Sequence, residues 1–238
     1  MTHSSEDIQP HEFWQEILPA GSHGSEPSQA FSRFYPARLP NGDTLRLPIR
    51  PLADGEHALA SLIINQASFA VVDRLATLLA ERVRALGPDI VVGLPTLGLT
   101  LAAAAAAKLG HARYVPLGTS RKFWYRDELS VSLLSITSPD QEKRLFVDPR
   151  MLALIEGRRV LLVDDVLSSG RSILAGLRLM QNIGVEPVAI GAAMLQTRRW
   201  KDALGAEMPH IVDRVQGVFE APMLRRGIDG EWLADAPD

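Results

Sequence analysis

Cysteine is absent from the 238 residues of this chain. Disulfides, thiolate nucleophiles and cysteine-ligated zinc sites all require that residue, so its absence excludes them. No apolar run approaches the ~20 residues that a membrane-spanning helix needs. The chain also opens on polar and acidic residues, unlike a signal peptide. We therefore expect a cytoplasmic protein with no membrane partner.

An excess of positive charge is also lacking. Lysine and arginine total 25 against 28 aspartates and glutamates, which gives a formal net charge of -3. A chain without an overall positive field is not expected to bind nucleic acid. The six histidines show no paired ligand spacing, so no zinc site is expected. With 46% hydrophobic residues, the chain can bury one α/β core of ordinary size.

Buried-strand and helical patterns alternate along the middle of the chain, which is typical of a parallel sheet. The pattern predicts an α/β fold, a Rossmann-like parallel sheet of about five strands with flanking helices. Strands are predicted at 89–94, 114–117, 144–147, 159–163 and 188–195, with one more at 211–218 and a possible one at 131–136. Helices are predicted at 68–86, 99–109 and 171–183.

The terminal segments differ from this pattern. A short helix is predicted from about Pro10 to Leu18, and Asn41-Gly42 between two extended runs predicts a β-hairpin. We expect a small hood made from both ends of the chain. The predicted division is an N-terminal extension, a core, and a C-terminal strand with a tail, over residues 1–67, 68–205 and 206–238.

The most informative segment follows the strand predicted at 159–163. Two carboxylates, Asp164 and Asp165, come at its end, and a loop then leads at once into a helix. That loop carries Ser168, Ser169, Gly170, Arg171 and Ser172. Loop amides and a helix N-terminus bind phosphate, whereas carboxylates bind sugar hydroxyls or a hydrated divalent metal. The alternative is that these residues have only a structural role, with an acid at the end of the strand and a serine cap at the start of the helix.

This segment resembles the phosphoribosyl-pyrophosphate (PRPP) loop of type I phosphoribosyltransferases, in particular the adenine and orotate types. The resemblance implies the fold of that family. It implies that Asp164 and Asp165 hold the ribose hydroxyls and, through water or those hydroxyls, Mg²⁺. It also implies that the loop from Ser168 to Ser172 cradles the 5′-phosphate.

A second strand-to-helix turn, Gly93 to Thr100, offers free amides in the same way. By the resemblance, Thr96, Leu97 and Gly98 form the loop that binds pyrophosphate. Many purine-specific members carry an arginine or lysine in this loop, and this chain has neither. A plain tight turn between strand and helix is the alternative.

Cations for the departing pyrophosphate are predicted from the next polar segment. There Arg121, Lys122 and Arg126 interleave with aromatic residues, namely Phe123, Trp124 and Tyr125. By its place after a strand, the segment resembles the start of a flexible loop that closes over the active site. We expect Arg121 and Lys122 to be catalytic and residues 121–136 to form a lid. A solvated basic loop or a nucleic-acid patch are the alternatives.

The predicted reaction transfers ribose 5-phosphate from PRPP to a nitrogen of a purine-like base, with Mg²⁺ as cofactor. Ser168 stands where hypoxanthine-guanine members have an acid, which favours the adenine and orotate types. Trp200 either stacks on the base or packs in the core. The family also implies a homodimer. A non-catalytic PRPP-binding regulator, or a protein phosphorylated on its aspartates, are the alternatives.

Overall fold

The parallel sheet predicted from the sequence is the centre of the computed structural model, which describes residues 8–23, 30–133 and 143–235. The strands run in the order β10-β11-β9-β5-β6, and β12 pairs with the other side of β11, all in parallel. Their bounds are β5 Ile90–Gly93, β6 Val115–Pro116, β9 Val160–Val163, β10 Val166–Leu167, β11 Ala189–Gln196 and β12 Val215–Ala221. The predicted α/β class is confirmed.

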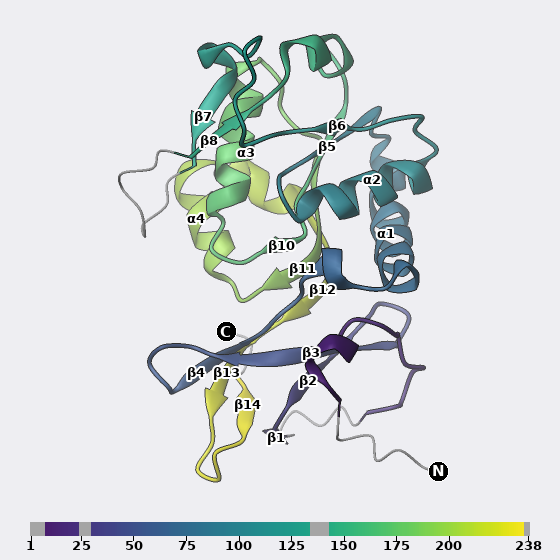
Figure 1. Ribbon diagram of the computed structural model, residues 1–238, viewed down its shortest axis with the longest axis vertical. Helices are drawn as coiled ribbons and strands as arrows, with labels where there is room; N and C mark the ends of the chain where they lie inside the picture. Colours follow the sequence, from purple (N-terminus) through teal and green to yellow (C-terminus); the bar gives the residue numbers. More distant parts are fainter. Residues whose placement is uncertain (1–7, 24–29, 134–142, 236–238) are drawn as a thin grey trace.

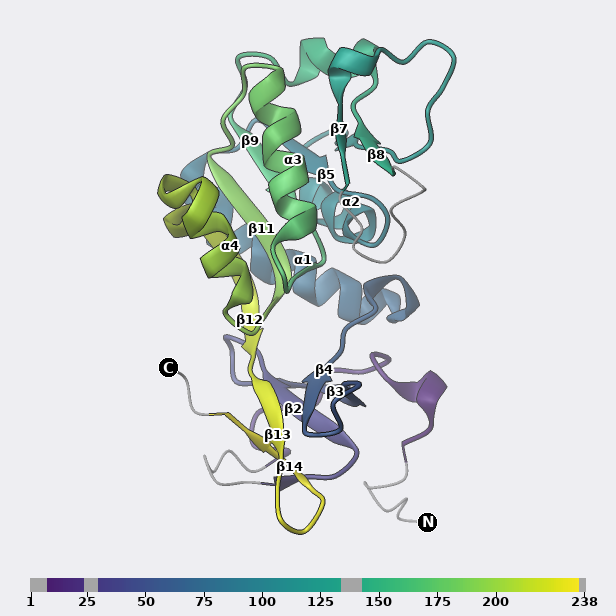
Figure 2. The same ribbon diagram turned by 90° about the vertical axis from the view of Figure 1, so that its left-hand side faces the viewer.

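Helices cover both faces of this sheet (Figure 1). The helices α1 (Phe69–Val83) and α2 (Gly98–Leu109) pack on one face, and α3 (Arg171–Asn182) and α4 (Arg199–Glu207) on the other (Figure 2). Ser68 caps α1 by accepting a hydrogen bond from the amide of Val71 at 3.2 Å. The alanine-rich α2 lies so close to the sheet that a Cβ on Gly93 would be 2.7 Å from the Cβ of Ala102.

A second sheet forms the hood and lies below the parallel sheet in Figure 1. It is antiparallel, with the strand order β1-β14-β13-β4-β3-β2. The bounds are β1 Ala30–Phe31, β2 Phe34–Arg38, β3 Thr44–Pro51, β4 His57–Ala60, β13 Met223–Arg226 and β14 Trp232–Ala234. Both chain ends therefore contribute, as predicted. The hairpin at Asn41-Gly42 is confirmed, with Gly42 at φ 87°.

Shorter elements complete the described chain. The strands β7 (Ser130–Ser132) and β8 (Arg144–Phe146) form a small antiparallel pair that packs on α3. The strand predicted at 131–136 thus exists in part, and its residues 134–136 lie outside the described residues. The 3₁₀ helices are Pro10–Glu12, Ile64–Gln66, Arg84–Leu86, Asp127–Leu129, Pro149–Leu154 and Pro209–Arg214. Among the described helices, none is long and apolar enough to cross a membrane.

The structure corrects the bounds of two predicted elements and the burial of one residue. The N-terminal helix ends at Glu12, because burial of Phe13 and Trp14 against the core takes the chain into extended and left-handed conformations. Phe69 belongs to the helical apolar pattern but is 94% exposed at the first position of α1. The strand predicted at 211–218 begins four residues later, at Val215, because a 3₁₀ helix precedes it.

Candidate active site

Two buried carboxylates stand at the carboxyl end of β9. Asp164 is 7% and Asp165 is 8% exposed, and each is fixed by main-chain hydrogen bonds. The amide of Asp164 donates to the carbonyl of Gly191 at 3.0 Å, and the carbonyl of Asp165 accepts from the amide of Ala193 at 3.0 Å. The amide of Asp165 donates to Oδ1 of Asp164 at 3.0 Å. The sheet itself therefore sets the position of both acids.

Burial dominates the electrostatics of this pair. It raises the pKa of Asp164 well above its usual value, and the neighbouring charge of Asp165 raises it further. Burial also raises the pKa of Asp165, although the hydrogen bond with Asp164 opposes that shift. Two carboxylates that are costly to ionise together are poised to bind a cation or to share hydrogen bonds with hydroxyl groups.

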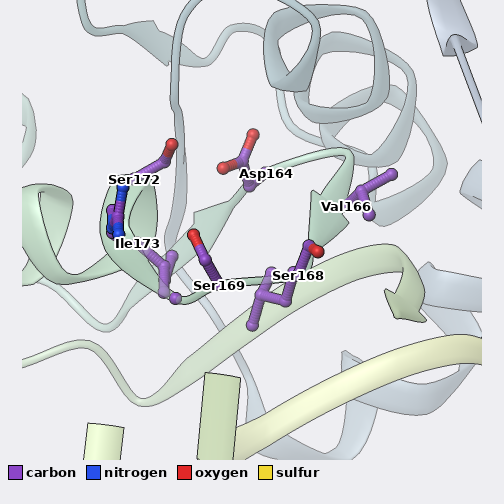
Figure 3. A pocket seen from close by; sticks show the side chains of 9 residues that line it. Asp164, Val166, Ser168, Ser169, Ser172 and Ile173 are labelled. Carbon is purple, nitrogen blue, oxygen red and sulfur yellow. The ribbon is translucent and has the colours of Figure 1, made fainter. Parts of the chain in front are cut away.

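A pocket of about 100 Å³ opens beside the acid pair. Its lining consists of Asp164 and most of the loop that follows, Val166, Leu167, Ser168, Ser169, Gly170, Arg171, Ser172 and Ile173. Figure 3 shows the side-chain oxygens of Asp164, Ser169 and Ser172 directed toward one common space. Because α3 begins at Arg171, the free amides of its first turn belong to the same pocket. An acid and an anion cradle are thus neighbours here.

The second predicted loop comes directly against the acid pair. Gly98 is the first residue of α2, and a Cβ placed on it would lie 2.8 Å from Oδ1 of Asp164. The same Cβ would lie 2.9 Å from the Cα of Asp164. Thr96 and Leu97 lead into this contact, and the peptide bond between Pro95 and Thr96 is cis. Both strand-to-helix turns therefore meet at one edge of the sheet.

The helix α4, which the sequence did not predict, supports the pocket from behind. Gly170 has φ 80°, and a Cβ there would lie 3.0 Å from the Cβ of Ala203 and 3.3 Å from the Cα of Trp200. Trp200 itself is only 3% exposed and packs in the core. The packing interpretation of Trp200 is confirmed, because a side chain that is buried in this way has no open face for a base to stack on.

The cationic segment at 121–126 lies away from this pocket. None of its residues is among those that line the pocket. Figures 1 and 2 place it at the end of the molecule farther from the hood. Phe123 is 97% exposed. Arg121 pairs with Asp127 at 3.2 Å. The roles of Arg121, Lys122 and Arg126 stay predictions, and the last part of the predicted lid, residues 134–136, lies outside the described residues.

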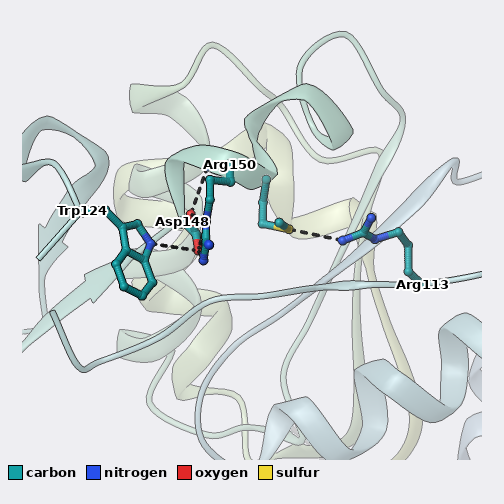
Figure 4. A network of polar contacts seen from close by, with 5 residues as sticks. Arg113, Trp124, Asp148 and Arg150 are labelled. Atoms are coloured by element: carbon teal, nitrogen blue, oxygen red, sulfur yellow. Dashed lines mark hydrogen bonds and ion pairs between the residues drawn. The ribbon is translucent and has the colours of Figure 1, made fainter. Parts of the chain in front are cut away.

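Trp124 is held in a separate surface network (Figure 4). Its Nε1 donates to Asp148 at 3.3 Å, and the guanidinium of Arg150 lies 4.6 Å from the centroid of its ring. Hydrogen bonds from Arg150 lower the pKa of Asp148 to about 2. Tyr125 packs on Phe146 with 5.7 Å between ring centroids. These aromatic residues anchor the segment on the surface.

Sequence reasoning missed the apolar part of the pocket lining. Val166, Leu167 and Ile173 line it together with the predicted polar residues. The sequence did carry a signal for Val166 and Leu167, because these two apolar residues stand between the acids and the serines. In the structure they form β10, which pairs with β11. A pocket with one apolar wall and one polar wall suits a ligand that has both kinds of surface.

The donor set of the acid pair fits Mg²⁺. This ion prefers oxygen ligands, and it usually binds through one or two carboxylates with water and substrate oxygens. Asp164 and Asp165 provide that number of carboxylates. No cluster of three or more His, Cys, Asp or Glu residues suited to a metal occurs among the described residues.

The family model of the phosphoribosyl transferase domain matches residues 61–213. The chain belongs to the type I phosphoribosyltransferase family. The matched part contains the acid pair, both strand-to-helix turns and the cationic segment, whereas all six strands of the hood lie outside it.

Curated relatives carry several names within this family. The chain is 35% identical to the bifunctional protein PyrR of Streptomyces coelicolor over 137 residues, 54% of this chain and 63% of that protein. It is 30% identical to the adenine phosphoribosyltransferase of Acidiphilium cryptum over 135 residues, 56% of this chain and 75% of that protein. The chain thus spans less than two thirds of the length of the Streptomyces relative.

Solved structures support the fold. The adenine phosphoribosyltransferase of Giardia lamblia, complexed with 9-deazaadenine, has a TM-score of 0.52 at 21% identity, covering 63% of this chain and 80% of that one. That of Leishmania tarentolae has a TM-score of 0.52 at 17% identity, covering 82% and 84%. At these identities the likeness establishes the fold alone.

Proposed function

We propose that this chain is an Mg²⁺-dependent phosphoribosyltransferase that transfers ribose 5-phosphate from PRPP to a ring nitrogen of a purine-like base. The observation that carries the proposal is the shared pocket of Asp164 and the Ser168–Ser172 loop. Membership of the family and the presence of adenine phosphoribosyltransferases among the relatives support it.

In this proposal the residues hold the substrate rather than react with it. The loop amides, Ser169 and Ser172 bind the 5′-phosphate, and the acid pair orients the ribose hydroxyls. The bond from C1′ to the pyrophosphate oxygen breaks, and its electron pair leaves with pyrophosphate. The base nitrogen forms the new bond to C1′, and its proton passes to solvent. Positive charge develops at C1′ and negative charge on the departing pyrophosphate, so fixed dipoles and charges at both groups lower the barrier.

Asp164 and Asp165 would hold Mg²⁺ through water or the PRPP hydroxyls, and the bound ion would neutralise charge on the departing pyrophosphate. The first turn of α2 after Thr96, Leu97 and Gly98 provides amides for the same group. In the proposal Arg121 and Lys122 add positive charge after a movement of their segment, because in the described conformation neither residue lines the pocket.

The alternative is a PRPP-binding regulator without transferase activity. The observation that supports this alternative is the similarity to PyrR proteins, which are named bifunctional. The deciding experiment is a pyrophosphate-release assay with Mg²⁺ and PRPP across adenine, guanine, hypoxanthine, xanthine, orotate and uracil. Release with a purine supports the proposal. Binding of PRPP by calorimetry without release for any base supports the regulator.

We also propose a cytoplasmic homodimer in which the exposed face of Phe123 packs against the second copy. A 97% exposed phenylalanine next to the half-exposed Trp124 is an apolar surface that dimerisation would cover. Light scattering of the full chain measures its mass. A dimer that becomes a monomer in Phe123→Ser supports this arrangement, and a monomeric wild-type chain contradicts it.

A further inference from the structure

The first turns of α3 and α4 carry more positive charge than one phosphate group needs. Arg171 is the first residue of α3 and lines the pocket. Arg198, Arg199 and Lys201 stand at the start of α4. All four are exposed, and no carboxylate in the described part of the chain pairs with any of them. Residues 166–185 contain no acid, so positive charge is concentrated at the pocket of a chain whose formal net charge is -3.

The helix α4 lies directly against the loop that forms the pocket. A Cβ on Gly170 would be 3.0 Å from the Cβ of Ala203 and 3.4 Å from the carbonyl oxygen of Trp200. Farther along, Arg178 of α3 donates to Glu207 of α4, with 2.7 Å between Nη2 and Oε1. Because the later residues of one helix meet the later residues of the other, α3 and α4 run side by side in the same direction (Figure 2).

This arrangement places Arg199 in front of the first turn of α3. Arg199 comes four residues before Ala203, so both lie on the same face of α4, and Arg199 stands about 6 Å closer to the beginning of that helix. Since Ala203 lies beside Gly170, where α3 starts, Arg199 lies beyond that start, on the side from which an anion reaches the free amides. Lys201, two residues from each, is on the opposite side of α4.

The 5′-phosphate of PRPP does not account for this pair of arginines. In the proposed reaction the loop amides, Ser169 and Ser172 provide its donors, and the pyrophosphate belongs to the other strand-to-helix turn. The guanidinium groups of Arg171 and Arg199 have no such assignment. A guanidinium binds phosphate oxygens through two parallel hydrogen bonds, so this pair suits a second phosphate group that is joined to the first.

We propose a second phosphate subsite at Arg171 and Arg199, next to the pocket, for the outer phosphates of nucleoside 5′-diphosphates and 5′-triphosphates. Their first phosphate occupies the cradle that the 5′-phosphate of PRPP uses, and the next one contacts the two guanidinium groups. Such nucleotides compete with PRPP, so the reaction slows when they are abundant. The inference rests on the proposed transferase function.

The test measures the affinity of AMP, ADP and ATP for the full chain by calorimetry, without Mg²⁺ so that the phosphates stay uncomplexed. The three ligands share the nucleoside and differ only in the number of phosphates. For the wild type we expect ADP and ATP to bind about tenfold more tightly than AMP, the ratio of one charge-assisted contact. In Arg199→Met we expect the three affinities to agree within about twofold. In pyrophosphate-release assays ADP should raise the KM for PRPP more in the wild type than in Arg199→Met.

Lys201→Met is the matched control, because it removes the same charge from the opposite side of α4 and should keep the preference for ADP over AMP. Equal affinities of AMP and ADP for the wild type, or an unchanged preference in Arg199→Met, overturn the second subsite. An equal loss of preference in Lys201→Met also overturns it, because a general effect of charge then explains the result. Failure of the wild type to bind PRPP with Mg²⁺ overturns the proposed function itself, whatever the three nucleotides show.

Discussion

Gly98 lies directly against Asp164, so the first turn of α2 and the acid pair form one continuous wall. The contact is too close for any side chain, since an added Cβ would meet both Oδ1 and the Cα of Asp164 within 3 Å. The two turns that hold opposite ends of PRPP in the proposed reaction are therefore coupled by van der Waals contact.

Gly98→Ala should accordingly destabilise the protein by about 1–3 kcal/mol, the usual cost of forcing an extra methyl into a packed site. It should also weaken PRPP binding, because Asp164 must move. The matched control is Gly205→Ala in α4, where the new Cβ meets nothing within 4 Å. Denaturant unfolding and calorimetry measure both effects. Equal stability of the two variants would contradict the close contact.

Asp164→Asn should separate stability from function. Removing one of two adjacent buried charges relieves the desolvation cost and the repulsion that raise the pKa of Asp164. We expect a higher midpoint of thermal unfolding at pH 7 and at least tenfold weaker binding of PRPP with Mg²⁺, about 1.4 kcal/mol. Asp202→Asn on the exposed side of α4 is the control. A variant that binds PRPP normally would remove Asp164 from the site.

A side chain at Gly170 should destabilise the protein in two ways, by contact with α4 and by the left-handed backbone conformation. Gly170→Ala places a side chain at φ 80° and 3.0 Å from the Cβ of Ala203. The left-handed conformation alone costs roughly 1–2 kcal/mol. The double variant with Ala203→Gly should recover the steric part of the loss but not the conformational part. A double-mutant cycle on unfolding free energies measures that coupling, and additive effects would show that the two residues do not touch.

The free energy of unfolding should depend on the ionisation of Asp148 at acid pH. Hydrogen bonds from Arg150 lower the pKa of Asp148 to about 2, below its ordinary value of 3.8. A lowered pKa stabilises the fold above about pH 4, and this contribution is lost as the pH falls toward 2. The stability difference between wild type and Arg150→Met should therefore shrink between pH 5 and pH 2.5 in denaturant titrations. Arg158→Met, at an exposed position, should show no such change.

Lys122→Ala tests the proposed role in pyrophosphate departure. An interaction that strengthens as the bond breaks lowers turnover more than substrate affinity. We expect about tenfold slower turnover, or roughly 1.4 kcal/mol, with little change in the affinity for PRPP. Lys108→Ala, which removes the outer ion pair with Asp73, is the control. Unchanged turnover in Lys122→Ala would place the cationic segment outside the reaction.

The sequence by itself determined the elements whose signals are local. The buried strand at 160–163, the two acids and the serine-glycine loop are contiguous, so their order predicted the strand, the loop and the helix, and the same residues carry the resemblance to the family. The turn at Asn41-Gly42 was predictable for the same reason, since Gly42 supplies the left-handed conformation that the hairpin needs.

Only the tertiary structure decided what depends on distant partners. The hood exists because β4 pairs with β13, more than 160 residues later in the chain, and no local pattern encodes that pairing. The segment around Trp14 was predicted as helix, but its indole instead donates to the carbonyl of Ser61 at 3.0 Å and is buried. Burial of a large aromatic side chain outweighs a weak helix propensity. Contacts such as that between Gly98 and Asp164 likewise arise only when separate strands meet at one edge of a sheet.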